Sequence, residues 1–370
     1  MKKKRKIEIA VAIPTFNRLE KLKAAIASIE RQRFDDSRIK LICCLANSAS
    51  YDGTAEYIKS LKKSSLTFIS FNKLVLSGEE VFKDSGHHNR IQLAEIIPKT
   101  VDWVWFLGDD DYFVHDQVIS SLAEVIERSE DLDPSLIHIS QARRSRRTGQ
   151  VIHGRLIELC NSLGFHEMLG WMSSLVMKTE VFKNYPGLAS RYPNSAYGHS
   201  AVFLELCASK SALFVDVAWV DTQDEVQTEE SIQRWALENM GERYFYVVDG
   251  ILLQFEEGII QQRLKPAFYR YHTYSLWDRY ANFLVVRALN TGKLTAEDLQ
   301  HWDRIRKIAD TLDDPVFAKL YLSWHSSLSS QIRDILKYQT LLIDARNGLA
   351  EYVNRLSGGC YPAYELLEPT

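Results

Sequence analysis

The most informative stretch of the sequence is Trp103-Val104-Trp105-Phe106-Leu107-Gly108-Asp109-Asp110-Asp111, in which an apolar run passes directly into three aspartates. The apolar run has the length and composition of a buried strand. Three adjacent carboxylates repel one another, so they must be solvated or neutralised by a cation. Mg²⁺ and Mn²⁺ favour one or two carboxylates together with substrate phosphates. The pattern therefore predicts a divalent-metal site at a strand end, and the alternative is a solvated turn before the next helix.

Before this stretch, strand patterns alternate with amphipathic helix patterns. The expected strands are Ile7–Ile13, Ile39–Ala46, Leu66–Phe71 and Trp103–Leu107. The expected helices begin near Asn17, Gly53 and His88. Asn17 is a plausible N-cap for the first helix, with Glu20 at the capping-box position. Such alternation predicts an α/β fold with a mostly parallel sheet and helices on both faces.

Three polar segments follow strands of this predicted sheet. They are Pro14–Arg18, Asn47–Gly53 and Gly108–Asp111. In α/β sheets of this kind, ligands bind beyond the carboxyl ends of the strands. We therefore expect the three segments to converge on one rim and to form the ligand site.

The rest of the chain divides into two regions. Further strands are expected at Ser135–Ser140, Val151–His153, Ser174–Lys178 and Leu213–Val217, and a helix at Ser200–Ala208. Gln141–Gln150 would join the first two of these strands, with a solvated hairpin tip. From about residue 229 helical periodicity dominates. The sequence thus predicts an α/β domain over residues 1–225 and a helical C-terminal domain over residues 226–370.

The composition narrows the function classes. The chain has 370 residues and a formal charge of -3, which does not suggest a nucleic-acid binder. Its five cysteines include no CxxC pair, so we expect buried thiols in a reducing compartment. Glu8 and Pro14 interrupt the apolar region that a signal peptide needs, and no stretch is long enough to span a bilayer. We expect a soluble cytoplasmic protein, whose Lys2–Lys6 cluster is a solvated tail before the first strand or touches the inner face of a membrane.

Two common phosphate-binding motifs are missing from the sequence. There is no GxxxxGK[ST] loop, and no GxGxxG turn follows a strand. A P-loop NTPase or an ordinary dinucleotide dehydrogenase is therefore disfavoured. The acidic segment would instead have to handle a diphosphate through its metal.

Four motifs, taken in order, resemble family 2 glycosyltransferases with the GT-A fold. They are Val11–Arg18 (VAIPTFNR), Asn47–Thr54 (NSASYDGT), Gly86–Arg90 (GHHNR) with Ala94, and Phe106–Asp111 (FLGDDD). The resemblance covers about residues 7–220, and the set is specific although each motif alone is weak. The Leu-Gly-Asp-Asp-Asp form most resembles bacterial enzymes of O-antigen and capsule assembly, such as abequosyltransferases.

The resemblance implies a role for each matching residue. Pro14, Thr15, Asn17 and Arg18 would line the nucleotide pocket, and Asn47 would contact the base. Asp52 would contact the nucleotide or the helix start, and Asn89 would complete the donor site. Asp109 would approach the ribose or the metal, and Asp111 would bind Mn²⁺ or Mg²⁺. Asp110 would act in catalysis, or would pair with Asp111 as the second metal ligand.

Two positions depart from the family pattern. Asn47 stands where an aspartate commonly accepts the uracil N3 proton, and an amide can both accept and donate. The donor therefore need not be linked to UDP. The family's usual acidic base is also missing, and Ala196-Tyr197-Gly198-His199-Ser200 occupies its place. His199 is the candidate general base there, because its ordinary pKa suits deprotonation of a hydroxyl.

Each of these candidates has a structural alternative. His199 could be a helix-terminal histidine bonded to the backbone, and Asp216 and Asp221 are weaker candidates for the base. Gly170 and Trp171 could bind an acceptor sugar by stacking, or Trp171 could pack in the core. The arginines of residues 143–147 could pair with a lipid-linked pyrophosphate, and Ser231–Trp235 only partly matches the motif of processive synthases.

The resemblance and the residues together predict a glycosyltransferase. It would move a sugar from a nucleotide-diphosphate donor to a hydroxyl of a glycan or lipid-linked acceptor, with inversion. The helical region could form a homo-oligomer or touch a membrane. A non-catalytic relative that binds nucleotides or glycans is one alternative, because the acidic base is absent. A sugar nucleotidyltransferase is the other, although Pro14–Arg18 lacks the glycines of such enzymes.

Overall fold

The structure is a computed structural model of the whole chain. It describes residues 6–61, 67–72, 89–142, 145, 147–163, 168–189 and 198–223. The chain divides into two compact units, and nearly all described residues belong to the first. Some expectations lie outside the described residues. One is the helical domain over 226–370, with its oligomer and membrane contacts. The others concern Lys2–Arg5, Gly86, Arg143, Arg144, Arg146, Ser231–Trp235 and Cys360.

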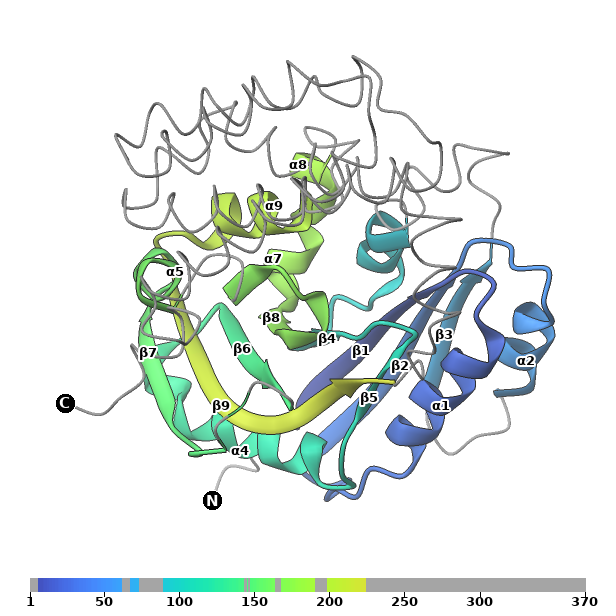
Figure 1. Ribbon diagram of the computed structural model, residues 1–370, viewed down its shortest axis with the longest axis horizontal. Helices are drawn as coiled ribbons and strands as arrows, with labels where there is room; N and C mark the ends of the chain where they lie inside the picture. The colour runs from blue at the N-terminus through green and yellow to red at the C-terminus, as the bar shows by residue number, and fades with distance from the viewer. Residues whose placement is uncertain are drawn as a thin grey trace, which may run out of the picture. The chain divides into compact units, whose positions relative to one another are not determined.

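The described residues form a mixed sheet with helices along the chain between the strands (Figure 1). The strands are β1 (Ile7–Thr15), β2 (Ile39–Asn47), β3 (Thr67–Asn72), β4 (Trp103–Phe106), β5 (Asp111–Phe113), β6 (Leu136–Gln141), β7 (Val151–Arg155), β8 (Leu175–Lys178) and β9 (Ser211–Thr222). The α-helices are α1 (Leu19–Glu30), α2 (Thr54–Ser60), α4 (Val118–Arg128), α5 (Leu156–Leu163), α7 (Thr179–Lys183), α8 (Tyr185–Ala189) and α9 (Gly198–Cys207). Residues 89–96 are also helical, and short 3₁₀ helices cover Glu130–Leu132 and Met172–Ser174.

Nine strands form the described sheet, in the order β3-β2-β1-β4-β8-β6-β9-β5, and β7 pairs with β9 off this path. β3, β2, β1 and β4 run parallel, which agrees with the alternation of strands and helices in the sequence. Beyond β4 the sheet becomes mixed, because β8 is antiparallel to both of its neighbours. The predicted α/β fold is confirmed, and the parallel half carries the three polar segments at its carboxyl ends.

The expectation that β6 and β7 form a hairpin is wrong. β6 pairs with β8 on one side and in parallel with β9 on the other, so neither of its edges is available to β7. β7 instead pairs antiparallel with the first half of β9, and its residues alternate between exposed and half-buried as in an edge strand. The two strands lie close in sequence, but β6 is buried over Leu136–Ser140 and has a partner on both sides.

Two apolar layers enclose the parallel half of the sheet. Alternate residues of β1 point to opposite faces, as in any strand. Ile9, Val11 and Ile13 belong to one hydrophobic cluster with buried residues of α1 and α4. On β4, Phe106 contacts Phe182 of α7 edge to face, with ring centroids 6.4 Å apart. Burial on both faces fixes the register of β1 and β4, and hence the positions of the loops that follow them.

The start of α1 differs from the prediction. Asn17 lies outside the helix in the left-handed region, with φ of 51°, and the N-cap position is Arg18. No side chain of the cap residue bonds to the helix. The Leu19 amide instead donates to Asp52 Oδ2, 2.9 Å away, from the loop after β2. Asn17 as the N-cap is therefore wrong, because a carboxylate from another segment takes that role.

Asp52 is expected to stabilise both helix starts. Burial alone would raise its pKa, but hydrogen bonds from Thr54 and Leu19 outweigh burial and lower the pKa. Replacing Asp52 with alanine should lower the free energy of unfolding by about 1 kcal/mol, the usual value of a helix cap. Urea unfolding at neutral pH measures this loss. Asp36→Ala, at an exposed turn position, is the matched control, and an equal loss in both variants would contradict the capping role.

Two further predictions concern the cysteines and membrane-spanning helices. The four cysteines within the described residues are Cys43, Cys44, Cys160 and Cys207, and all are buried and free, as expected. Burial raises the pKa of each of these thiols. In the part of the chain that the structure describes, no helix has both the length and the apolarity to cross a membrane.

Candidate functional site

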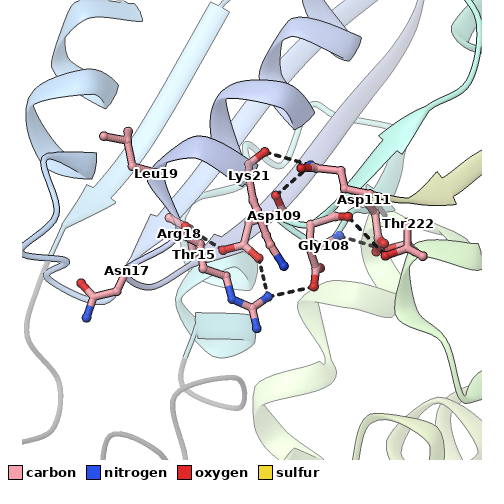
Figure 2. A network of polar contacts seen from close by, with 12 residues as sticks. Thr15, Asn17, Arg18, Leu19, Lys21, Gly108, Asp109, Asp111 and Thr222 are labelled. Atoms are coloured by element: carbon pink, nitrogen blue, oxygen red, sulfur yellow. Dashed lines mark hydrogen bonds and ion pairs between the residues drawn. The ribbon is translucent and has the colours of Figure 1, made fainter. Parts of the chain in front are cut away.

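The segments after β1 and β4 meet at the carboxyl ends of these strands (Figure 2). Thr15 Oγ1 donates to Asp109 Oδ2, 2.8 Å away. Arg18 Nη1 lies 3.2 Å from Asp109 Oδ1 and 2.9 Å from Asp110 Oδ2. The predicted convergence of these segments is therefore present. Both carboxyl oxygens of Asp109 are already bonded to protein groups.

The loop after β2 joins the same rim through Asn17. Its backbone amide donates to Ser50 Oγ at 2.9 Å, and its side-chain oxygen accepts from the Tyr51 amide at 3.0 Å. Asn17 thus links the β1 and β2 loops, which explains its left-handed backbone better than a capping role does. Pro14 lies at the end of β1 in register with Ala46 of β2.

Asn47 and Asn89 are buried behind this rim. Asn47 is wholly inaccessible, and its Oδ1 accepts from the amide and the hydroxyl of Ser50. Asn89 is 3 % exposed and its Oδ1 accepts from Ser48 Oγ at 2.5 Å. Both asparagines therefore shape the loop over residues 47–50, and in this conformation Asn47 presents no surface to a ligand.

Gly108 lets two carboxylates of the acidic triplet fold back over the backbone. A Cβ at position 108 would lie 2.5 Å from Asp111 Oδ2 and 2.9 Å from Asp110 Oδ1. These two oxygens therefore converge on one point that only a glycine leaves open. Asp111 is 4 % exposed, whereas Asp110 is half-buried.

Within the described residues, the ion pairs with Arg18 do not neutralise the three aspartates of the triplet. Burial and the Asp110 carboxylate raise the pKa of Asp111 to about 7. Burial also raises the pKa of Asp109, although Arg18 opposes this. Arg18 is the ion-pair partner that the structure gives to Asp109 and Asp110, and its own pKa is raised by them despite its burial. An added cation would relieve the repulsion.

The donor set fits a hard divalent cation. Asp110 and Asp111 offer two carboxylates, and Mg²⁺ or Mn²⁺ commonly takes its other ligands from water and substrate phosphates. Within the described residues, no three His, Cys, Asp or Glu side chains are grouped as a complete metal site. A metal held by two aspartates would therefore need a substrate to complete its ligands.

Ser173 and Gln223 also contact the acidic triplet, and neither was predicted from the sequence. Ser173 Oγ accepts from the Gly108 amide at 2.8 Å and donates to Asp111 Oδ2. Gln223, at the end of β9, donates from its amide to the Asp110 carbonyl at 2.7 Å and from Nε2 to the Lys21 carbonyl at 2.9 Å. No motif surrounds either residue, and only the pairing of β9 with β5 brings Gln223 to the acidic triplet.

His199 and the Gly170–Trp171 segment are neighbours. His199 is 4 % exposed, and its Nε2 lies 3.2 Å from the Gly170 carbonyl oxygen. Ser200 Oγ donates to the next carbonyl, that of Leu169, at 3.0 Å. Trp171 is partly buried against the main core cluster. The start of α9 therefore holds the segment that leads into Ser173 and so to Asp111.

The weaker candidates for the base have structural roles. Asp216 accepts from Ser145 Oγ and Thr148 Oγ1, at 2.8 and 2.7 Å, and so closes the turn before β7. Asp221 accepts from Gln141 Nε2 at 3.4 Å and from the Thr222 amide at 2.9 Å.

A cavity of about 970 Å³ lies elsewhere, at the amino ends of β1 and β4, and none of the predicted site residues lines it.

Comparison with known proteins supports the resemblance to family 2 glycosyltransferases. Residues 10–185 match the family model described as Glycosyl transferase family 2. No curated protein matches the sequence. Among solved structures, S. aureus TarS 1-349 is similar at 14% identity and a TM-score of 0.54 over 92% of each chain. A longer TarS chain gives 14% identity and a TM-score of 0.51, over 93% of this chain and 55% of that one.

A third structure is more distant. The mannosyltransferase PcManGT from Pyrobaculum calidifontis, in complex with GDP-Man and Mn²⁺, has 13% identity and a TM-score of 0.47. The match covers 95% of this chain and 88% of the mannosyltransferase. At 14% identity, the TarS structures show a shared fold and nothing finer.

Proposed function

We propose that the chain is a family 2 glycosyltransferase, whose family model matches residues 10–185, and that it transfers a sugar from a nucleoside-diphosphate donor to a hydroxyl, with a divalent metal and with inversion. One observation carries the metal dependence. Asp110 and Asp111 converge over Gly108 beside the buried Asp109, with more negative charge than Arg18 neutralises. A donor diphosphate with Mn²⁺ or Mg²⁺ would complete this site.

The contacts within the triplet favour one pair of metal ligands. The sequence pointed to Asp109 and Asp111, with Asp110 as the other option. Thr15 and Arg18 already occupy both oxygens of Asp109. We assign Asp110 and Asp111 to the metal, and Asp109 to the placement of Arg18 and, through the β1 loop, of the nucleotide. A bound metal would supply electrostatic stabilisation of the leaving diphosphate.

The chain's own groups then account for donor binding. Arg18 lies on the rim with a half-buried guanidinium, where it can donate to phosphate oxygens as well as to Asp110. Asn17 and Asp52 hold the loops on either side of that position. Ser173 keeps the Asp111 carboxylate oriented over Gly108. A preorganised positive charge such as that of Arg18 stabilises the developing negative charge of the leaving group.

Asn47 leaves the donor base open. Its oxygen is committed to Ser50, so a uracil N3 proton would have to find another acceptor or a rearranged loop. We therefore keep the proposal that the donor need not be UDP-linked. The Leu-Gly-Asp-Asp-Asp form supports a glycan or lipid-linked acceptor of O-antigen or capsule assembly, on the cytoplasmic side of the membrane.

Titration calorimetry of the whole chain with UDP-, GDP-, CDP- and dTDP-sugars, with and without Mn²⁺, tests the proposal. The expected result is saturable binding of one nucleotide family that is lost when the metal is removed. Binding of one donor without transfer or hydrolysis would favour a non-catalytic relative. Formation of a sugar nucleotide from a nucleoside triphosphate would favour a nucleotidyltransferase. Binding of no nucleotide in any condition would refute the proposed function.

His199 is our candidate for the general base. Because it contacts Gly170, it could instead position the Gly170–Trp171 segment, and one variant distinguishes the two roles. His199→Gln keeps a side-chain hydrogen-bond donor but cannot act as a general base near neutral pH. We expect kcat to fall at least about a hundredfold. Metal-dependent donor binding should stay unchanged. The assay is release of the nucleoside diphosphate from the bound donor in the presence of acceptor.

The matched control for this test is His153→Gln, because His153 is exposed on the edge strand β7. It should retain full turnover. A raised acceptor KM with unchanged kcat in His199→Gln would show that His199 only positions the Gly170–Trp171 segment. That result would remove it from the proton transfer.

A further inference from the structure

Arg90 is a half-buried arginine without a carboxylate partner in the part of the chain that the structure describes. Its Nε donates to Tyr185 Oη at 2.9 Å, and its Nη1 lies 3.6 Å from Met172 Sδ. Arg38 and Arg155, in contrast, each pair with a glutamate at 2.6 Å. Among the described residues, the groups that contact the Arg90 guanidinium are neutral, so none of them balances its charge.

The surroundings of Arg90 make this costly. Tyr185 is wholly buried and contacts the rings of Phe182 and Phe203, with centroids 6.1 and 5.5 Å away. A charge placed against such an apolar cluster loses part of its hydration, and a carboxylate or another anion normally compensates for the loss. An arginine kept there without one contributes little to stability. It is better explained by an anion that arrives with a ligand.

The contacts on both sides of Arg90 lead to the candidate site. Its neighbour Asn89 accepts from Ser48 in the loop that follows β2. Met172, against its Nη1, precedes Ser173, which bonds to Asp111. The guanidinium therefore lies between the nucleotide loop and the segment that orients the acidic triplet.

We propose that Arg90 binds an oxyanion of a substrate, a phosphate or a carboxylate, between the loop after β2 and the segment that orients the acidic triplet. This inference rests on the proposed function, because it deepens the same site. Nε and Nη1 are already oriented by Tyr185 and Met172, so the planar fork is fixed before the ligand arrives. Nη2 makes no hydrogen bond within the described residues and can donate to the anion. The oxyanion could come from the donor diphosphate or from a charged acceptor.

Arg90→Gln removes the charge and keeps a hydrogen-bond donor, and Arg90→Lys keeps the charge without the fork. Each is titrated with the nucleoside diphosphate and the nucleoside that the wild type binds, in Mn²⁺. Inorganic phosphate is then titrated into the protein saturated with the diphosphate and Mn²⁺. Arg155→Gln, at an exposed arginine of β7, is the matched control, and thermal unfolding checks the fold of each variant.

We expect Arg90→Gln to weaken oxyanion binding about tenfold to a hundredfold, as for a lost charge-assisted hydrogen bond, with a smaller loss in Arg90→Lys. Weaker diphosphate binding with unchanged nucleoside binding would place the donor diphosphate on Arg90. Unchanged diphosphate binding with lost phosphate binding would place a charged acceptor there. Wild-type affinity for both probes in Arg90→Gln overturns the proposal.

Failure of the proposed function gives a different result. If no nucleotide binds the wild type, the glycosyl-transfer proposal falls. Phosphate titrated into the free chain then still tests Arg90 by itself. Binding that the wild type shows and Arg90→Gln lacks would leave the oxyanion site standing. Equal phosphate binding in both would remove it.

Discussion

Asp111→Asn is expected to lose metal-dependent sugar transfer, with turnover at least about a hundredfold lower, as for other groups that stabilise charge in a transition state. Asp111 is buried, its carboxylate converges with that of Asp110, and Ser173 fixes its orientation. Asparagine keeps the shape and the bond from Ser173, but it removes the negative charge that holds a divalent cation. The loss should therefore concern metal affinity rather than folding.

Two measurements separate these effects. Thermal unfolding of the wild type with its bound nucleoside diphosphate should shift upward on addition of Mn²⁺, because a ligand that binds only the folded state stabilises it. Asp111→Asn should lose this shift. Asp131→Asn, which changes an exposed aspartate of the short 3₁₀ helix after α4, should keep it. A normal Mn²⁺ shift in Asp111→Asn would exclude Asp111 as a ligand.

The same variant should change the pH dependence of stability in metal-free protein. Burial and Asp110 raise the pKa of Asp111 to about 7 in the folded state. Since the charged form is disfavoured there, Asp111 lowers stability as the pH rises from its unfolded pKa of about 4 through about 7. The wild type in chelator should unfold at a higher temperature near pH 5.5 than near pH 7.5, and Asp111→Asn should show a smaller difference. Equal differences in both would contradict the buried charge.

The sequence predicted the parallel half of the fold because local patterns determine it. β1, β2 and β4 are short apolar runs with helices between them, so their parallel direction and the rim at their carboxyl ends follow from general rules. The Thr15, Arg18 and Asp109 contacts confirm that rim. The mixed half was harder, since the pairing of β9 with β6, β7 and β5 joins segments far apart in the chain.

The site residues likewise fall into those that the sequence reveals and those that only the tertiary structure reveals. The aspartates stand out in the sequence because three charges follow an apolar strand. Ser173 lies 62 residues away from Asp111, and a lone serine carries no signal of its own. Asn47 was expected to face the base. Its buried amide oxygen instead accepts two hydrogen bonds from Ser50, and these contacts depend on the tertiary structure of the loop. Short polar side chains can bond to their own loop or to a ligand, and sequence does not separate the two.

Gly108→Ala is expected to impair the metal site almost as strongly as loss of an aspartate, although it removes no ligand. The new Cβ would lie 2.5 Å from Asp111 Oδ2 and 2.9 Å from Asp110 Oδ1, closer than atoms can approach. Ser173 holds Asp111 and Arg18 holds Asp110, so neither carboxylate can turn away without breaking a bond. The two oxygens would be forced apart, and Mn²⁺ affinity should fall at least about tenfold, as when a group that orients a metal ligand is lost.

The control for this substitution is Gly154→Ala on β7, where an added Cβ meets its nearest atoms at an ordinary 3.5 Å. Both variants should fold, since Gly108 lies at a strand end and is half-buried. Calorimetric titration with Mn²⁺ in the presence of the bound nucleoside diphosphate compares them. If Gly108→Ala kept the wild-type affinity, the metal could not depend on the convergence of Asp110 and Asp111. Asp109, bonded to Thr15 and Arg18, would then have to exchange those partners for the metal.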